Sequence, residues 1–147
     1  MLVVIFSCGL LIALTTVIHY EVLRVLNTGL PSLKIPNRTK LLVVIFGTFA
    51  AHALEMSVYG VTLFGLIKYM DVGGLSAPAS FSLINCLYFS AETYTSLGFG
   101  DLTPIGPIRM LAGVEALNGL LLIGWSASYT YIAMERFWAD GNKDRQP

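Results

Sequence analysis

Residues 95–101, TSLGFGD, lie between two long apolar runs and contain two glycines, an aromatic residue and an aspartate. Glycine destabilises regular helices and strands, and an aspartate is expensive to place in lipid. Irregular backbone at membrane depth is stable only where protein buries it or where it lines water. The stretch therefore predicts a re-entrant segment held by surrounding protein.

The composition is that of a membrane protein. Of the 147 residues, 55% are apolar and only 12% are charged, about half the charged fraction of a typical soluble domain. The formal net charge is zero, which gives no support for nucleic-acid binding or for a strongly acidic partner. Cys8 and Cys86 both lie in apolar stretches, so we expect two separate core thiols.

Three apolar runs are long enough to cross a bilayer, which takes roughly 20 residues. They cover residues 1–18, about 41–67 and about 108–134. Because the first run lacks a positive leading region and a small-residue cleavage site, we expect a retained helix rather than a signal peptide. A fourth run, from Phe81 onward, is too short to span, and Ser80 is its expected helix N-cap.

The positions of the basic residues predict the orientation. Four of the nine Lys and Arg lie between the first two runs, three follow the last run, and two lie in the remaining connection. By the positive-inside rule, the first connection and the C-terminus are cytoplasmic, and the N-terminus is outside a multi-pass plasma (inner) membrane. The first connection contains Arg24, Lys34, Arg38 and Lys40. Arg136, Lys143 and Arg145 follow the last run, and the remaining connection contains Lys68 and Arg109.

The tract TSLGFGDLTP resembles the selectivity filter of potassium channels, which usually reads T-T-V-G-Y-G-D before a proline-containing turn. The resemblance covers about residues 81–138. It implies an all-α membrane protein with three transmembrane helices plus a re-entrant pore helix and selectivity-filter loop, assembling as a homotetramer. The implied parts are an N-terminal peripheral helix and cytoplasmic loop (1–37) and a pore module (38–147) with outer helix 38–69, pore helix 81–95, filter 95–101, inner helix 107–136 and a short cytoplasmic tail.

Filter chemistry explains the two glycines. Consecutive backbone carbonyls must point at one axis, where they replace the hydration shell of an ion, so every second residue adopts a left-handed or similar conformation. Gly98 and Gly100 provide this conformation at little steric cost. By the resemblance, permeant potassium ions, with no organic cofactor, bind the carbonyls of the filter residues Ser96, Leu97, Gly98, Phe99 and Gly100, and the Ser96 hydroxyl forms the innermost site.

Residues behind the filter are expected to support it. Glu92 lies in SAETYTS, which resembles SVETATT of the two-helix, proton-activated bacterial potassium channel, where the matching glutamate shares a proton with the following aspartate. Here the partner is Asp101, and Tyr88 lies on the same helical face as Glu92 and can donate to the pair. Alternatively, Glu92 accepts hydrogen bonds from filter N–H groups. Thr95 completes the expected support.

Three ionisable residues are embedded in the second and third runs: His52, Glu55 and Glu115. Glu115 is expected at the depth of Glu55, where it can meet His52 or Glu55 behind the pore. Two interpretations remain open, a proton-sensitive network or ordinary hydrogen bonds between helices. A further set is expected as an interfacial cluster at the cytoplasmic end of the first run: His19, Glu21 and Arg24.

The last run carries two glycines, Gly119 and Gly124. Gly119 falls where related channels bend to open, although glycine can equally permit close helix packing. A 3–4 spacing predicts a face that lines the cavity or packs in the bundle core, made of Leu120, Ile123, Ala127 and Tyr131.

The leading functional prediction is a potassium-selective channel whose partners are three further copies of itself and membrane lipid, with no nucleic acid. Because Ser96 and Leu97 replace the usual threonine and valine in the inner half of the filter, a non-selective monovalent cation channel is one alternative. A non-conducting or transport-associated membrane subunit is another. We expect no enzyme, since the sequence shows no Ser/His/Asp set, clustered metal ligands or phosphate loop.

Overall fold

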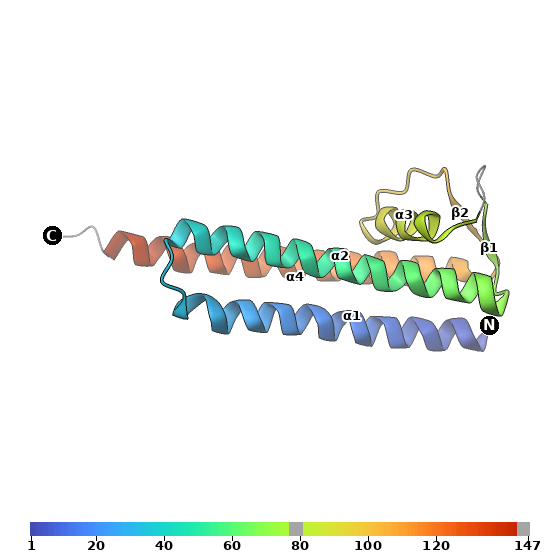
Figure 1. The fold of residues 1–147 in the computed structure, drawn as a ribbon, viewed down its shortest axis with the longest axis horizontal. Coiled ribbons are helices and arrows are strands. Elements are labelled where there is room, and N and C mark those ends of the chain that lie inside the picture. The colour runs from blue at the N-terminus through green and yellow to red at the C-terminus, as the bar shows by residue number, and fades with distance from the viewer. Residues whose placement is uncertain (77–80, 144–147) are drawn as a thin grey trace.

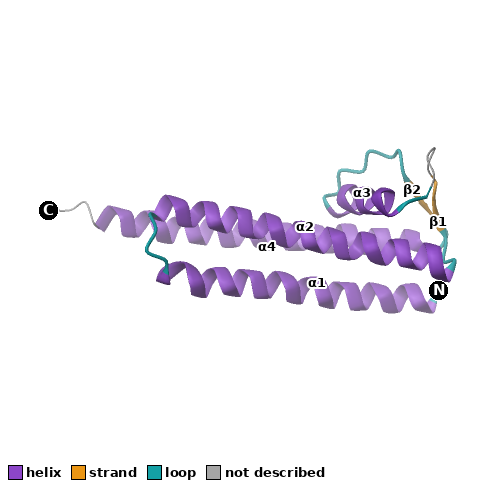
Figure 2. Ribbon diagram, viewed as in Figure 1, coloured by secondary structure: helices purple, strands orange, loops and turns teal. Residues whose placement is uncertain are grey.

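The computed structural model describes residues 1–76 and 81–143, and side chains as far as residue 138. Three long helices lie side by side, and a short helix and two short strands sit at one end (Figures 1 and 2). The elements in order are α1 (Leu2–Gly29), the 3-10 turn η1 (Leu30–Ser32), α2 (Asn37–Met70), β1 (Gly74–Ser76), α3 (Leu83–Tyr94), β2 (Thr103–Ile105) and α4 (Ile108–Lys143).

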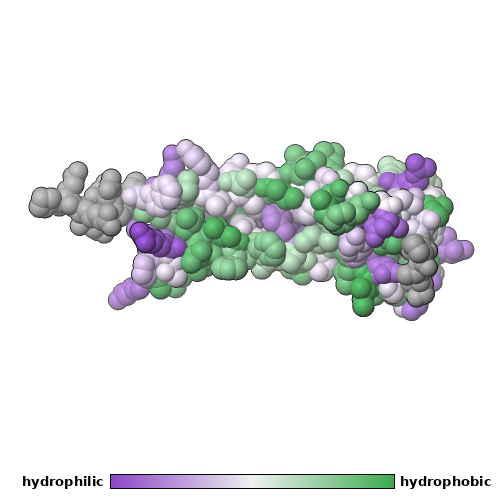
Figure 3. Space-filling view, turned by 90° about the horizontal axis from the view of Figure 1, so that it is seen from above, coloured by the Kyte–Doolittle hydropathy of each residue, from purple (hydrophilic) through white to green (hydrophobic). Residues whose placement is uncertain are grey.

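Three segments of the described chain are long and apolar enough to cross a membrane: Leu2–Ser32, Asn37–Met70 and Ile108–Trp138. Hydrophobic residues dominate the middle of the face drawn in Figure 3, and hydrophilic ones gather mainly toward its two ends. The first span is longer than the predicted 1–18, because the helix continues through His19 and Glu21. The fold is all-α, as expected, with three membrane helices and a re-entrant segment.

The short helix α3 lies on the opposite side of α2 and α4 from α1 (Figure 1). Its N-cap is Ser82, whose hydroxyl oxygen accepts the Asn85 N–H at 3.2 Å. The predicted cap, Ser80, lies outside the described residues. With 12 residues and about 18 Å of length, α3 is too short to span a bilayer.

An antiparallel pair of short strands, β1 and β2, closes the base of the re-entrant segment, where the sequence predicted only loop. Leu75 lies opposite Pro104 in the register. Gly73 enters the pair with φ 87°, and a Cβ there would lie 2.3 Å from the Ile105 carbonyl oxygen. Glycine is therefore required at this position. The strand pair joins the two ends of the segment that carries α3 and the filter tract.

The chain ends and the connections between helices are divided between the two ends of the bundle. The N-terminus lies at the end that carries β1 and β2, and the C-terminal end of α4 lies at the other (Figure 1). At that second end, the Asn37 side-chain amide donates to the Phe137 carbonyl at 3.0 Å. The basic α1–α2 connection and the last turns of α4 thus share one end. The inner helix continues to Lys143, beyond the predicted end at 136.

Candidate functional site

The filter tract follows α3 as irregular backbone with an alternating conformation. Ser96, Gly98 and Gly100 have φ of 57°, 56° and 82°, whereas Leu97 and Phe99 between them do not adopt positive φ. Alternation of this kind turns successive carbonyls toward the same side. Among the described residues, the carbonyl oxygens of 96–100 accept no hydrogen bond. These five carbonyls therefore have no hydrogen-bond donor within the described part of the chain.

The tract is anchored to the end of α3 through its N–H groups. The Ser96 N–H donates to the Thr93 carbonyl at 3.0 Å. The Glu92 carbonyl accepts both the Leu97 N–H at 2.9 Å and the Gly98 N–H at 3.2 Å. The donors are thus used toward the helix while the acceptors stay free, which is the polarity that cation binding requires.

A single chain leaves this tract uncovered. The side chains of Leu97 and Phe99 are 60% and 67% exposed. They border an open concavity whose other lining residues are Met56, Tyr88, Ala91, Glu92 and Thr95. This exposed apolar surface lies beside the carbonyls of 96–100, which accept no hydrogen bond among the described residues.

The Glu92 side chain supports the filter directly. Its Oε2 accepts the Phe99 N–H at 3.2 Å, as the second interpretation of this residue expected. Within the described residues it makes no hydrogen bond to Asp101, which instead accepts the Tyr88 hydroxyl at 3.4 Å and the Leu102 N–H at 3.1 Å. Burial raises the pKa of Glu92, the charge of Asp101 adds to the rise, and the Phe99 N–H opposes it. A proton shared between the two carboxyls stays a prediction.

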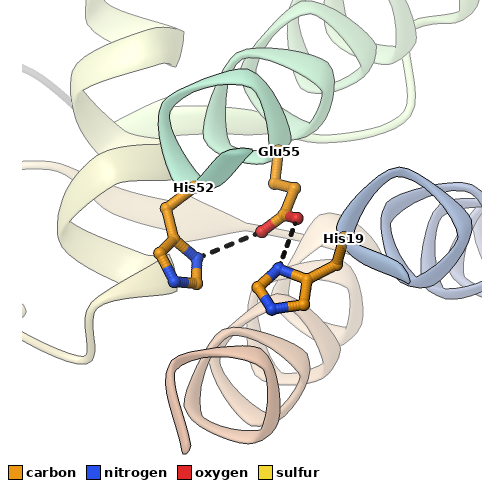
Figure 4. A group of neighbouring side chains, drawn as sticks. All are labelled: His19, His52 and Glu55. Carbon is orange, nitrogen blue, oxygen red and sulfur yellow. Dashed lines mark hydrogen bonds and ion pairs between the residues drawn. The ribbon is translucent and has the colours of Figure 1, made fainter. Parts of the chain in front are cut away.

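His19 does not lie in an interfacial cluster, which corrects the sequence-based expectation. Its side chain is fully buried, and its Nδ1 lies 2.9 Å from Oε1 of the equally buried Glu55 (Figure 4). Glu21 and Arg24 form an exposed ion pair one helical turn further along, at 3.0 Å. The helix continues past residue 18, so His19 falls inside the span and on its buried face.

A continuous hydrogen-bond network runs from α1 to the pore helix α3. The carboxylate of Glu55 lies 3.2 Å from His52 Nδ1 and accepts the hydroxyl of Tyr94, the last residue of α3. Both histidines direct Nε2 toward the Ser126 hydroxyl of α4, His52 at 3.0 Å and His19 at 3.2 Å. The first helix is therefore hydrogen-bonded to α2 and α4 and does more than pack beside them.

Glu115 does not join His52 or Glu55, contrary to the sequence-based expectation. Its carboxylate accepts the Ser90 hydroxyl, which also lies 2.7 Å from the Met56 carbonyl. The predicted set of His52, Glu55 and Glu115 therefore divides into two separate groups, one at the end of α3 and one in its middle.

A further polar group, which the sequence analysis missed, joins α1, α2 and α4. The Asn118 amide donates to Thr15 Oγ1 at 2.8 Å and to the Tyr59 hydroxyl at 3.2 Å. A signal was present, because Thr15 and His19 stand four residues apart in an apolar run and so share one helical face.

The glycines and the predicted lining residues of α4 have distinct environments. A Cβ at Gly119 would lie 2.1 Å from the Tyr94 carbonyl oxygen, whereas nothing lies within 4 Å of one at Gly124. Close packing is therefore the observed role of Gly119, and bending at either glycine stays a prediction. The residues predicted to line the cavity are all exposed in the single chain, and they are Leu120, Ile123, Ala127 and Tyr131.

The sequence comparisons agree with this arrangement. The model of an ion channel family matches residues 39–136, two thirds of the chain. The inward rectifier potassium channel Kirbac3.1 of Paramagnetospirillum magnetotacticum is 37% identical over 67 residues, which are 45% of this chain and 22% of that protein. No solved structure matches the chain. A family match of this extent, on three apolar helices and a re-entrant filter tract, shows that the chain is a membrane protein of the ion channel family and not an enzyme.

Proposed function

We propose that the chain forms a potassium-selective channel through which ions pass passively along backbone carbonyls. The observation that carries the proposal is the alternation of φ at Ser96, Gly98 and Gly100, with the intervening carbonyls unbonded within the described residues. Carbonyl rings of this kind replace the hydration shell of K⁺. The similarity to a protein named as a potassium channel supports the same ion.

Four copies are needed to enclose an ion, because one chain supplies one strand of filter. A closed ring with a four-fold axis at the filter is the arrangement in which identical carbonyl strands face one another. The exposed side chains of Leu97 and Phe99 support this assembly, since neighbouring copies would cover them. The exposed residues of α4, among them Leu120 and Tyr131, are then available to line the cavity and to contact neighbouring inner helices.

The proposed orientation places the filter end and the N-terminus outside the inner membrane, with the α1–α2 connection and the C-terminus in the cytoplasm. Its support is the positive-inside rule together with the meeting of Asn37 and Phe137 at one end of the bundle. Reagents that label an introduced cysteine from one side test it. A Ser32→Cys variant, at the exposed end of η1 between α1 and α2, should be labelled only from the cytoplasmic side.

A non-selective cation pore is the second candidate, and Ser96 and Leu97 favour it. Ser96 holds φ 57° without the methyl group that threonine would pack behind the innermost site. Leu97 is bulkier than valine, and its side chain helps to set the diameter of the ring. Both differences fall in the inner half of the filter.

Ion flux from proteoliposomes distinguishes the candidates. Purified protein is reconstituted, and uptake of K⁺ and of Na⁺ is measured under matched gradients, with barium as a blocker. Flux of K⁺ that exceeds Na⁺ flux and is blocked by barium supports the selective channel. Equal flux of both ions supports the non-selective pore, and no flux of either ion across a range of pH contradicts both.

A further inference from the structure

The network at the end of α3 gathers side chains that coordinate metal ions. One nitrogen each from His19 and His52 and one carboxylate oxygen of Glu55 all lie within 4.8 Å of one another. Figure 4 shows both imidazole rings directed at the same carboxylate, His19 from α1 and His52 from α2. The sequence analysis expected no clustered metal ligands, and His19 stands more than thirty positions before His52 and Glu55, so only folding brings it to them.

The separations of the donor atoms are close to those around a tetrahedral ion. Zinc binds imidazole nitrogen and carboxylate oxygen at about 2.0–2.1 Å, so neighbouring ligand atoms lie about 3.3 Å apart. Glu55 Oε1 lies 2.9 Å from His19 Nδ1, and Glu55 Oε2 lies 3.2 Å from His52 Nδ1, so the two rings approach different oxygens of one carboxylate. One ligand atom from each of the three residues lies within 4.8 Å of the other two, so small side-chain rotations bring them to one ion.

A fourth oxygen completes the set. The Tyr94 hydroxyl lies 2.9 Å from His52 Nδ1 and is bonded to Glu55. It thus lies beside two of the three other residues of the cluster. Four ligands from α1, α2 and α3 would leave no coordination position for water.

The network accommodates a metal ion with one defined tautomer of each ring. Ser126 lies within hydrogen-bond distance of the Nε2 atoms of both histidines. If a metal ion binds both Nδ1 atoms, each ring carries its hydrogen on Nε2, and both Nε2–H groups donate to the two lone pairs of Ser126.

The surroundings favour a bound cation over a bare carboxylate. Glu55 is fully buried in a membrane-spanning helix, and among the described residues no Lys or Arg pairs with it. Ser126, bonded to the outer nitrogens of both rings, acts as the partner that fixes ring orientation in metal sites. The His52 side chain is 16% exposed, which provides an entry path for the ion.

We propose that His19, His52, Glu55 and Tyr94 bind one Zn²⁺ per chain and thereby tie the first helix to the end of the pore helix. The site is independent of which ion the pore conducts, so a failure of the flux experiment leaves it unaffected. Imidazole and oxygen ligands in tetrahedral geometry are the set that zinc prefers.

Metal binding by the untagged full-length protein tests the proposal. The chain contains two histidines, and both are in the cluster, so histidine-dependent binding has no other source. Equilibrium dialysis against Zn²⁺ should give one ion per chain, and Co²⁺ in its place should give the intense visible absorption of a tetrahedral site. Wild-type protein that binds no zinc and shows no such absorption overturns the proposal.

Variants locate the ion. His19→Gln and His52→Gln should each abolish the cobalt absorption, and Ser126→Ala should weaken zinc binding about 10–100-fold. Glu21→Gln, an exposed carboxylate on α1 near His19, and the double variant Cys8→Ser with Cys86→Ser should bind as wild type does. Histidine variants that elute with the wild-type oligomer and retain the absorption overturn the assignment, whereas loss of absorption in the cysteine variant moves the site to the thiols.

Discussion

The inner helix and the end of the pore helix touch backbone to backbone at one point: a Cβ at Gly119 would lie 2.1 Å from the Tyr94 carbonyl oxygen. The same Tyr94 donates its hydroxyl to Glu55 on the opposite side of the pore helix end. Tyr94 is followed at once by the filter tract. The position of the filter relative to α4 is therefore set at Gly119, and its position relative to α1 and α2 is set at Glu55.

Gly119→Ala should move the end of the pore helix. Because the contact is with backbone atoms, which no rotamer change can relieve, we expect a destabilisation of about 1–3 kcal/mol and loss of K⁺ flux. Gly113→Ala is the control, since nothing lies within 4 Å of a Cβ there within one chain, and alanine favours the helix. Thermal unfolding in detergent and proteoliposome flux measure both effects. A Gly119→Ala channel with wild-type stability and flux would exclude the close contact.

Gly98→Ala should stop conduction through backbone strain alone. Its φ is 56°, a conformation that costs an L-residue about 1–2 kcal/mol, and nothing in the same chain lies within 4 Å of the added carbon. The strain is relieved when the peptide rotates, which turns a carbonyl away from the ion path. Gly65→Ala, in α2 and equally uncrowded, carries the same chemical change without positive φ and should conduct normally. Equal flux through both variants would remove the alternating backbone as the basis of conduction.

Ser90→Ala should destabilise the protein without touching the filter. The Ser90 hydroxyl is bonded to the carboxyl group of Glu115, which is 2% exposed, and lies 2.7 Å from the Met56 carbonyl. Removing the hydroxyl leaves buried polar groups without a partner, which costs about 1–3 kcal/mol. Ser57→Ala, where an exposed serine bonds only the Ala53 carbonyl of its own helix, should cost much less. The two variants are compared by thermal unfolding, and equal losses would contradict the burial argument.

The sequence predicted the elements better than the contacts between them. Apolar run lengths located the three spanning helices, and the glycine spacing of TSLGFGD located the alternating backbone, because both signals are local. The Glu92 contact with the Phe99 N–H could also be predicted, since the two residues are seven positions apart in one re-entrant segment.

Pairings between helices could not be predicted in the same way. Because α1 continues to Gly29 and does not end with the apolar run at residue 18, His19 lies in the interior and not at an interface, and run length alone does not fix helix ends. Rotation of each helix about its axis decides which partner a buried carboxylate meets, so Glu115 was wrongly expected near Glu55. The β1–β2 pair was missed because three-residue strands have no periodicity to detect.

Thr15 and Asn118 should contribute coupled, not independent, stability. The Asn118 amide donates to Thr15 Oγ1 at 2.8 Å and is 6% exposed, so the bond joins α1 to α4 in the interior. A double-mutant cycle with Thr15→Val and Asn118→Leu should give a coupling energy of about 0.5–1.5 kcal/mol. Thr62→Val with Asn118→Leu is the control cycle, because Thr62 bonds its own helix at Val58. Coupling that is no larger than in the control would mean that α1 is not held by this bond.

Glu92→Gln should change how stability depends on pH. Burial and the charge of Asp101 raise the Glu92 pKa above 4.5, so the folded protein holds this proton to higher pH than the unfolded chain does. The resulting stability is fully present below pH 4.5 and is lost as pH rises through the raised pKa. Glutamine resembles the protonated acid and keeps an oxygen for the Phe99 N–H.

Thermal unfolding of the detergent-solubilised protein in steps upward from pH 4.5 measures this dependence. Wild-type melting temperature should fall with pH more steeply than that of Glu92→Gln, and the variant should be the more stable of the two at the upper end. Glu21→Gln removes an exposed carboxylate from α1 and should keep the wild-type slope. Parallel slopes for wild type and Glu92→Gln would show that the carboxylate is ionised behind the filter throughout this range, held by the Phe99 N–H alone.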